Sequence, residues 1–102
     1  MIPLLSERRL DIGSLCERYS VAEMDVFGSA ARGDFEASRS DVDLAVRFKP
    51  LSPREYRDCY FSLLFSLEDL LKRSVELVDL DAQSNPVFKE SIESEKQVLY
   101  AA

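Results

Sequence analysis

The sequence predicts an α/β (α+β) fold in which helices pack on a small mixed sheet of about four strands. The chain has 102 residues, of which 46% are hydrophobic. This is enough to bury one core but not two. The hydrophobic pattern changes several times between the alternation of strands and the spacing of helices, and no repeat or linker interrupts it. We therefore expect residues 1–102 to form a single domain, in the order helix, strand, loop, strand, helix, strand, helix, strand.

The N-terminal part of the chain predicts one helix and two strands. Apolar residues recur at helical spacing up to about Tyr19, and either Ser6 or Asp11 could cap this helix. Val21–Phe27 and Asp41–Phe48 are short segments rich in β-branched and aromatic residues. The stretch between them is rich in glycine, serine and charge, so we expect two strands joined by a polar loop.

A long helix follows, and its start is the clearest boundary in the sequence. Ser52 and Glu55 have the spacing of a capping box, with Pro53 at the first helical position. The helix should run to about Arg73. One face should pack on the sheet, because apolar residues recur along it at three- and four-residue spacing: Tyr56, Cys59, Tyr60, Leu63, Leu67 and Leu70.

Phe61 and Phe65 do not belong to that packed face. Being four residues apart, they should stack on the opposite side of the helix. Large exposed apolar side chains often mark a surface that binds a partner. The alternative is that the last helix of the chain covers them.

The C-terminal part predicts a strand, a short helix and a closing strand. Val75–Leu80 has the composition of a strand. Asn85 and Pro86 are typical of a helix start, and this helix should end at about Ser94. Gln97–Tyr100 then forms the last strand.

Composition excludes several kinds of site. The net charge is −6 and no cluster of lysine and arginine is present, which argues against a surface for direct nucleic-acid binding. The chain has no histidine, so it lacks the commonest general base and the commonest zinc ligand. Carboxylates are the plentiful alternative, and they favour hard cations.

Cysteine usage and hydropathy suggest a cytoplasmic protein. Cys16 and Cys59 lie far apart among apolar residues of predicted helices, so we interpret both as buried, unreactive core thiols. No apolar stretch is as long as a signal peptide or a membrane span requires. No membrane association is expected.

A Gly-Ser turn follows the first strand directly, in the run from Phe27 to Asp34. A glycine there lets backbone N–H groups approach a phosphate, and the Ser29 hydroxyl adds a donor. Such a pair after a strand is more often an ordinary turn. The turn by itself therefore does not decide between the two interpretations.

A pair of aspartates opens the second strand, in the run Ser40-Asp41-Val42-Asp43-Leu44. Residues i and i+2 of a strand point to the same face, where two carboxylates repel each other unless a cation lies between them. The alternative is a pair that caps a turn or faces water at a strand edge. Combined with the Gly-Ser turn, however, the pair predicts a phosphate cradle beside a metal site.

Two runs of the sequence resemble the signature of a known family. The runs from Val26 to Gly33 and from Ser40 to Val46 resemble the signature of the minimal nucleotidyltransferase branch of the polymerase β-like superfamily. The resemblance covers essentially the whole chain and implies the single-domain nucleotidyltransferase fold. It also implies that Gly28 and Ser29 bind a triphosphate, and that Ser40 lies among the nucleotide-binding residues.

The same resemblance implies a metal site built from Asp41, Asp43 and Glu76. The family carries its third carboxylate on the strand after the long helix, and Glu76 takes that position, where it would also accept the proton of the attacking hydroxyl. Asp79 is the rival, but alternation puts it on the other face of the strand from Glu76. The apolar neighbours do not decide which of the two faces is the active one.

Two departures from the family pattern bear on activity. Eleven residues separate Ser29 from Asp41, one more than is usual in the family. The family's third carboxylate is an aspartate, and the extra methylene of Glu76 moves the carboxylate by over an ångström, a displacement that can cost about a hundredfold in rate.

The reaction implied is in-line attack of a hydroxyl on the α-phosphorus of ATP, assisted by Mg²⁺, with pyrophosphate leaving beside Gly28 and Ser29. Arg32 would help to neutralise the triphosphate, or would instead pair with a nearby carboxylate such as Asp34.

Relatives of this type are commonly antitoxins that attach AMP to a tyrosine of a HEPN-domain toxin. The competing interpretation is a binding module that neutralises a toxin by covering it through Phe61 and Phe65. Modification of a small molecule is a third, weaker alternative, because such enzymes usually carry an extra domain for the acceptor.

Overall fold

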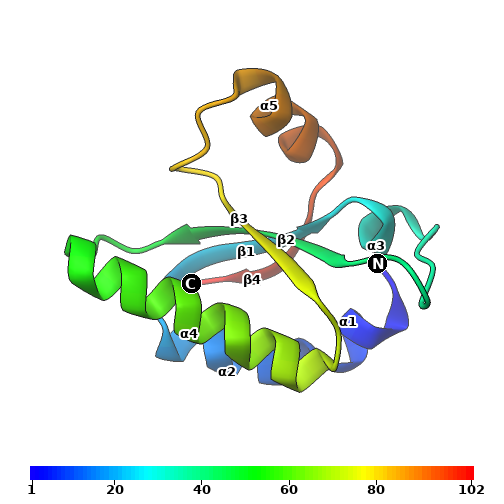
Figure 1. The fold of residues 1–102 in the computed structure, drawn as a ribbon, viewed down its shortest axis with the longest axis horizontal. Helices are drawn as coiled ribbons and strands as arrows, with labels where there is room; N and C mark the ends of the chain where they lie inside the picture. Colours follow the sequence, from blue (N-terminus) through cyan, green and yellow to red (C-terminus); the bar gives the residue numbers. More distant parts are fainter.

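The computed structural model describes residues 1–102 and contains one four-stranded sheet with helices on both faces (Figure 1). The strands lie in the order β3-β2-β1-β4; β1 is antiparallel to β2 and β4, while β2 and β3 are parallel. The elements are α1 (Pro3–Glu7), α2 (Arg9–Arg18), β1 (Val21–Phe27), α3 (Ser29–Arg32), β2 (Val42–Phe48), α4 (Pro53–Leu71), β3 (Val75–Asp79), α5 (Pro86–Glu95) and β4 (Gln97–Ala101). The predicted fold class is confirmed.

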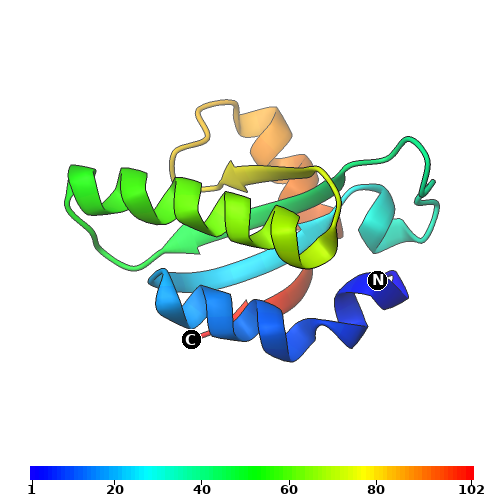
Figure 2. The ribbon, with the colours of Figure 1, turned by 60° about the horizontal axis from the view of Figure 1, so that its bottom comes forward.

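The main core lies between the sheet and the helices α2 and α4, which run side by side across one face (Figures 1 and 2). Leu63 and Leu67 of α4 are fully buried against Val26 and Leu44 of the central strands in this cluster. Full burial of each such side chain contributes about 1.5–3 kcal/mol.

The opposite face of the sheet carries only α5 (Figure 1). A second, smaller cluster joins this helix to the sheet through Phe27, Ala45, Leu80 and Ile92. Because the cluster is small, much of this face remains available to polar side chains. Two of the predicted site residues, Asp43 and Glu76, lie on this face, because Asp43 pairs with Phe27 and Glu76 pairs with Asp43.

Local signals predicted the later helices closely. In α4, Ser52 Oγ accepts a hydrogen bond from the Glu55 N–H at 3.2 Å, and Glu55 Oε1 accepts one from the Ser52 N–H at 3.1 Å, so the capping box is confirmed. The helix ends at Leu71, where Lys72 takes a left-handed conformation with φ 55°. The Asn85 side chain caps α5 as expected.

The N-terminal segment differs from the prediction. It forms two helices separated at Arg8 rather than one, and neither Ser6 nor Asp11 caps them, because the cap positions are Ile2 and Arg8 and neither makes a side-chain cap. The predicted polar loop also contains the short helix α3.

The structure decides two expectations about individual side chains. Phe61 and Phe65 stack, with ring centroids 6.3 Å apart, and they are 48% and 63% exposed, as predicted. The last helix does not cover them, because α5 lies on the other face of the sheet (Figure 1). Cys16 is buried, and burial raises the pKa of its thiol to about 12. Cys59 is only half-buried, since it lies at the margin of the packed face of α4.

None of the helices combines the length and the apolar composition that crossing a membrane requires.

Candidate active site

The turn between β1 and α3 brings backbone close to an acidic side chain of β2. Gly28 has φ 66° and ψ −151°, a conformation that only glycine adopts easily. Its strand neighbour Phe27 pairs with Asp43 across the antiparallel ladder. A Cβ atom at position 28 would collide with the Asp43 carboxylate. Glycine is therefore needed here both for its conformation and for this close approach.

Asp43 and Glu76 lie opposite each other on the parallel strands β2 and β3. Register partners project from the same face of a sheet, so the two carboxylates are neighbours. Burial, the adjacent Glu76 and the charge of Asp41 together raise the pKa of Asp43 to about 6, and Arg32 lowers it in part. The structure thus places Glu76 beside Asp43, one of the two predicted aspartates.

Asp41 and Ser40 lie just before β2. Asp41 is exposed, and its charge reaches Asp43 two residues later in the chain. The Ser40 hydroxyl accepts a hydrogen bond from the Glu36 N–H at 3.0 Å, and the Ser40 N–H donates to the Glu36 carbonyl at 2.7 Å. The side chain of Ser40 thus stabilises the turn that precedes Asp41 and β2.

The carboxylates of Asp41, Asp43 and Glu76 suit a hard cation, but they do not form a complete metal site. Carboxylate oxygens are the ligands that Mg²⁺ prefers. Asp43 and Glu76 are side by side, and burial followed by the neighbouring Glu76 raises the pKa of Asp43. No group of three potential ligands is arranged to hold a metal as it stands. Asp41 and Glu76 are both exposed.

Comparison with known proteins assigns the family. Residues 11–102 match the family model described as polymerase beta, nucleotidyltransferase. The chain belongs to this nucleotidyltransferase family. It is similar to two proteins of Methanocaldococcus jannaschii named as protein adenylyltransferases, with 38% and 33% identity over 81 residues, or 79% of this chain and of each relative.

Solved structures agree with this assignment. The fold is similar to that of a minimal nucleotidyltransferase with a TM-score of 0.78 and 32% identity, covering 91% of this chain and 90% of that one. It is also similar in fold to a toxin–antitoxin complex with AMP-PNP, with a TM-score of 0.73 and 23% identity, covering 92% of this chain and 73% of that one. The expectation of a minimal nucleotidyltransferase, and hence of an enzyme, is confirmed.

Arg32 and Gly28 of the nucleotidyltransferase share an acidic partner that the sequence did not predict. Glu95, the last residue of α5, accepts a hydrogen bond from the Gly28 N–H at 3.0 Å and one from Arg32 Nη1 at 3.3 Å. Arg32 Nε also lies 3.5 Å from Asp34. Arg32 therefore pairs with carboxylates in this structure. No local signal could have identified Glu95, which lies 67 residues from Gly28 in the sequence.

Asp79, the rival to Glu76, has a structural role in the nucleotidyltransferase. It lies at the end of β3, opposite Val46, and its Oδ1 accepts hydrogen bonds from the N–H groups of Asp81 and Ala82 at 2.9 and 3.3 Å. This carboxylate closes the turn that follows the strand. The structure thus separates the two acids: Glu76 lies on the face of Asp43, whereas Asp79 lies at the end of β3 and bonds to the turn that follows.

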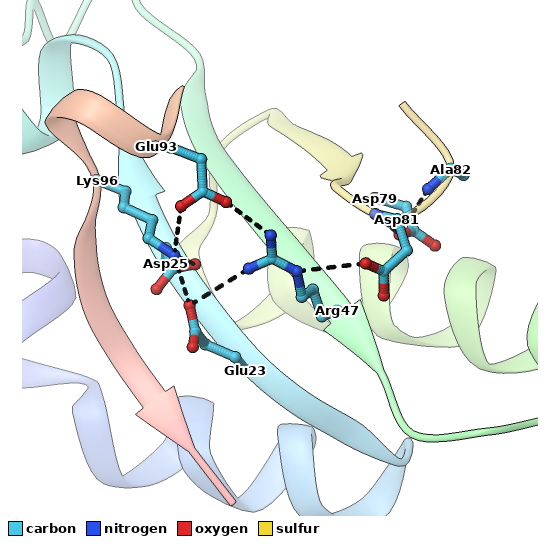
Figure 3. A network of polar contacts seen from close by, with 8 residues as sticks. All are labelled: Glu23, Asp25, Arg47, Asp79, Asp81, Ala82, Glu93 and Lys96. Atoms are coloured by element: carbon cyan, nitrogen blue, oxygen red, sulfur yellow. Dashed lines mark hydrogen bonds and ion pairs between the residues drawn. The ribbon is translucent and has the colours of Figure 1, made fainter. Parts of the chain in front are cut away.

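A network of charged side chains joins α5 to the sheet of the nucleotidyltransferase (Figure 3). Lys96 Nζ lies 2.9 Å from Glu23 and 3.1 Å from Glu93. Arg47 of β2 lies 2.6 Å from Glu93 and 3.3 Å from Asp81. Lys96 and Arg47 thus each form ion pairs with more than one acidic side chain. The network fixes the end of α5, from which Glu95 extends toward Gly28.

Asp25 lies beneath this network and is 1% exposed. Its carboxylate oxygens have no hydrogen-bond partner, and Lys96 Nζ is 3.6 Å away. Burial, followed by the neighbouring Glu23, raises the pKa of Asp25 to about 7, and Lys96 acts against that rise. No local pattern in the sequence marks this residue, because its burial follows only from the fold.

Proposed function

We propose that the chain is a Mg²⁺-dependent enzyme that transfers AMP from ATP to a hydroxyl of a partner protein. The observation that carries the proposal is the pairing of Asp43 with Glu76 directly beside the backbone of Gly28. The relatives from Methanocaldococcus jannaschii that are named as protein adenylyltransferases support the same chemistry. The motif residues Gly28 and Ser29 would bind the triphosphate, while Ser40 orders the loop before Asp41.

The reaction is a substitution at the α-phosphorus. The acceptor oxygen forms a bond to this phosphorus, and the bond between the phosphorus and the bridging oxygen of the β-phosphate breaks. The pyrophosphate formed leaves on the side of Gly28 and Ser29, and the Glu76 carboxylate accepts the proton of the acceptor hydroxyl. Mg²⁺, held by Asp41, Asp43 and Glu76, would supply neutralisation of the developing charge.

The acceptor that we propose is a tyrosine of a HEPN-domain toxin, with the chain acting as the antitoxin. A solved complex of an AMPylated Shewanella oneidensis HEPN toxin with its MNT antitoxin has the same fold, at 20% identity and a TM-score of 0.67 over 96% of this chain and 73% of that one. Phe61 and Phe65 offer an exposed apolar surface for such a partner. The reaction would take place in the cytoplasm, where ATP is available and unpaired cysteines stay reduced.

The direct experiment is incubation of the purified protein with Mg·ATP and a HEPN-domain toxin, followed by intact-mass measurement of the toxin. The expected result is a mass gain of one adenylyl group, confined by peptide mapping to a tyrosine. Asp43→Asn should abolish the gain, and chelation of the metal should do the same. A toxin that gains no mass with the unmodified protein would exclude this enzymatic role.

A second candidate is a binding module that neutralises the toxin by covering it. The stacked and exposed pair Phe61 and Phe65 favours this function, because binding alone does not need the acids. Asp41→Asn separates the candidates. An enzyme should lose toxin neutralisation with this substitution, whereas a pure binder should keep it.

A further inference from the structure

The turn at Gly28, which we propose binds phosphate, is occupied in the structure by a carboxylate of the same chain. The Glu95 carboxylate accepts hydrogen bonds from the Gly28 N–H at 3.0 Å and from Arg32 Nη1 at 3.3 Å. A backbone N–H and a guanidinium are typical donors to a phosphate oxygen. One carboxylate therefore occupies two of the donors that would bind a triphosphate.

The two residues that follow Glu95 in the chain hold its backbone at this position. Lys96, the next residue, is fixed by ion pairs to Glu23 and Glu93. Gln97 follows, and its Nε2 donates a hydrogen bond to the Ala31 carbonyl in α3 at 3.3 Å. The backbone beside Glu95 is thus anchored to β1 and α3. Its side chain, by contrast, is 31% exposed and can rotate away without moving α5.

We propose that Glu95 is an internal competitor of the triphosphate and sets the affinity for nucleotide. In the absence of nucleotide it neutralises Arg32 and occupies the Gly28 N–H. Binding of ATP requires the carboxylate to rotate outward, because two anions cannot share the same donors and would repel each other. This inference rests on the proposed function, since it takes the triphosphate to bind at the Gly28 turn.

Removing the competitor should tighten nucleotide binding. Glu95→Gln keeps the shape of the side chain and an oxygen that can accept from Gly28, but it removes the negative charge. Glu95→Ala removes both. Because a charge-assisted hydrogen bond is stronger than a neutral one, we expect the affinity for Mg·ATP to rise roughly tenfold in Glu95→Gln and further in Glu95→Ala. Glu90→Gln removes the same charge from an exposed position of α5 and should leave the affinity unchanged.

Calorimetric titration of Mg·ATP, and of Mg²⁺ with inorganic triphosphate, into the unmodified protein and these variants tests the proposal. Tighter binding of both ligands by the two Glu95 variants alone supports it. If the unmodified protein binds and the Glu95 variants bind equally or more weakly, the competitor role is overturned while the proposed function stands. If neither the unmodified protein nor any Glu95 variant binds either ligand, the nucleotide site itself is wrong and both inferences fall.

An NMR measurement checks the contact without nucleotide. In a ¹⁵N-labelled protein the Gly28 amide resonance should move in Glu95→Ala and stay in place in Glu90→Gln. An unchanged Gly28 resonance in Glu95→Ala would overturn the contact on which the proposal depends. Thermal unfolding of each variant identifies any that has lost the fold, and Glu95→Gln serves if Glu95→Ala unfolds.

Discussion

Asp43 of β2 and Glu76 of β3 lie opposite each other on a parallel strand pair, and their side chains project from the same face of the sheet. Burial and the neighbouring Glu76 raise the pKa of Asp43 to about 6. A fold selected for stability alone gains nothing from two adjacent carboxylates on one face. A cation that binds between them would remove the repulsion.

Glu76→Gln should reduce the transferase rate at least a hundredfold, because removal of a general base typically costs a factor of about 10² to 10⁴. Asp79→Asn is the matched control on the same strand. Asp79 faces the turn, and an asparagine oxygen can still accept from the N–H groups of Asp81 and Ala82, so the rate should stay within about threefold. Single-turnover kinetics with the partner toxin measures both. A large loss in Asp79→Asn with none in Glu76→Gln would reverse the assignment of the two acids.

Gly28→Ala should destabilise the fold by more than about 2 kcal/mol, because the new Cβ meets both a strained backbone conformation and the Asp43 carboxylate. Gly33→Ala isolates the backbone part. Gly33 has φ 92°, but a Cβ there has no neighbour within 4 Å, so its cost should be about 1 kcal/mol. Urea unfolding of the two variants measures the difference. Equal costs would mean that Asp43 does not pack against Gly28 in solution.

The sequence predicted most of the elements because their signals are local. A capping box, a proline at a first helical turn and an alternating strand are each read within a few residues, and the bounds of α4, β3 and α5 follow them closely. The break at Arg8 has no such signal, since neither α1 nor α2 has a side-chain cap. A continuous apolar stripe cannot reveal that the backbone turns there.

The site was only partly predictable for the same reason. The resemblance to a family indicated Glu76, but alternation alone could not decide which face of β3 is active; that depends on the register with β2. The contacts of Glu95 and Asp25 could not be predicted from the sequence, because they form only when α5 folds back over the sheet. Contacts between residues so distant in sequence follow from the topology and not from any local pattern.

Replacing Phe61 and Phe65 together by serine should weaken binding of the partner toxin more than tenfold, because large aromatic side chains contribute more than about 1 kcal/mol each when they lie at the centre of an interface. The fold should be little affected, since both side chains are largely exposed. Leu10→Ser changes a side chain of α2 that is 88% exposed and should leave the affinity unaltered. Surface plasmon resonance against immobilised toxin compares the variants. Undiminished binding by the double variant would place the interface elsewhere.

Asp25→Asn should make the stability of the protein less dependent on pH. The pKa of Asp25 is raised to about 7 in the folded protein, against an ordinary value near 4, so the folded state holds this proton more tightly than the unfolded state. Stability from this group is therefore greatest in acid and is lost as the pH rises from about 4 to about 7. Above that range the folded protein carries a buried charge without a hydrogen-bond partner.

The measurement is urea unfolding of both proteins at pH 5 and pH 8. The advantage of Asp25→Asn over the unmodified protein should grow by more than about 1 kcal/mol between the two pH values. Glu23 of the same strand, Arg47 of β2, and Glu93 and Lys96 at the end of α5 face this carboxylate (Figure 3), but both proteins carry them, so their own titration largely cancels in the comparison. An advantage that is equal at both pH values, or larger at pH 5, would mean that Asp25 stays ionised in the folded protein and that Lys96 compensates it fully.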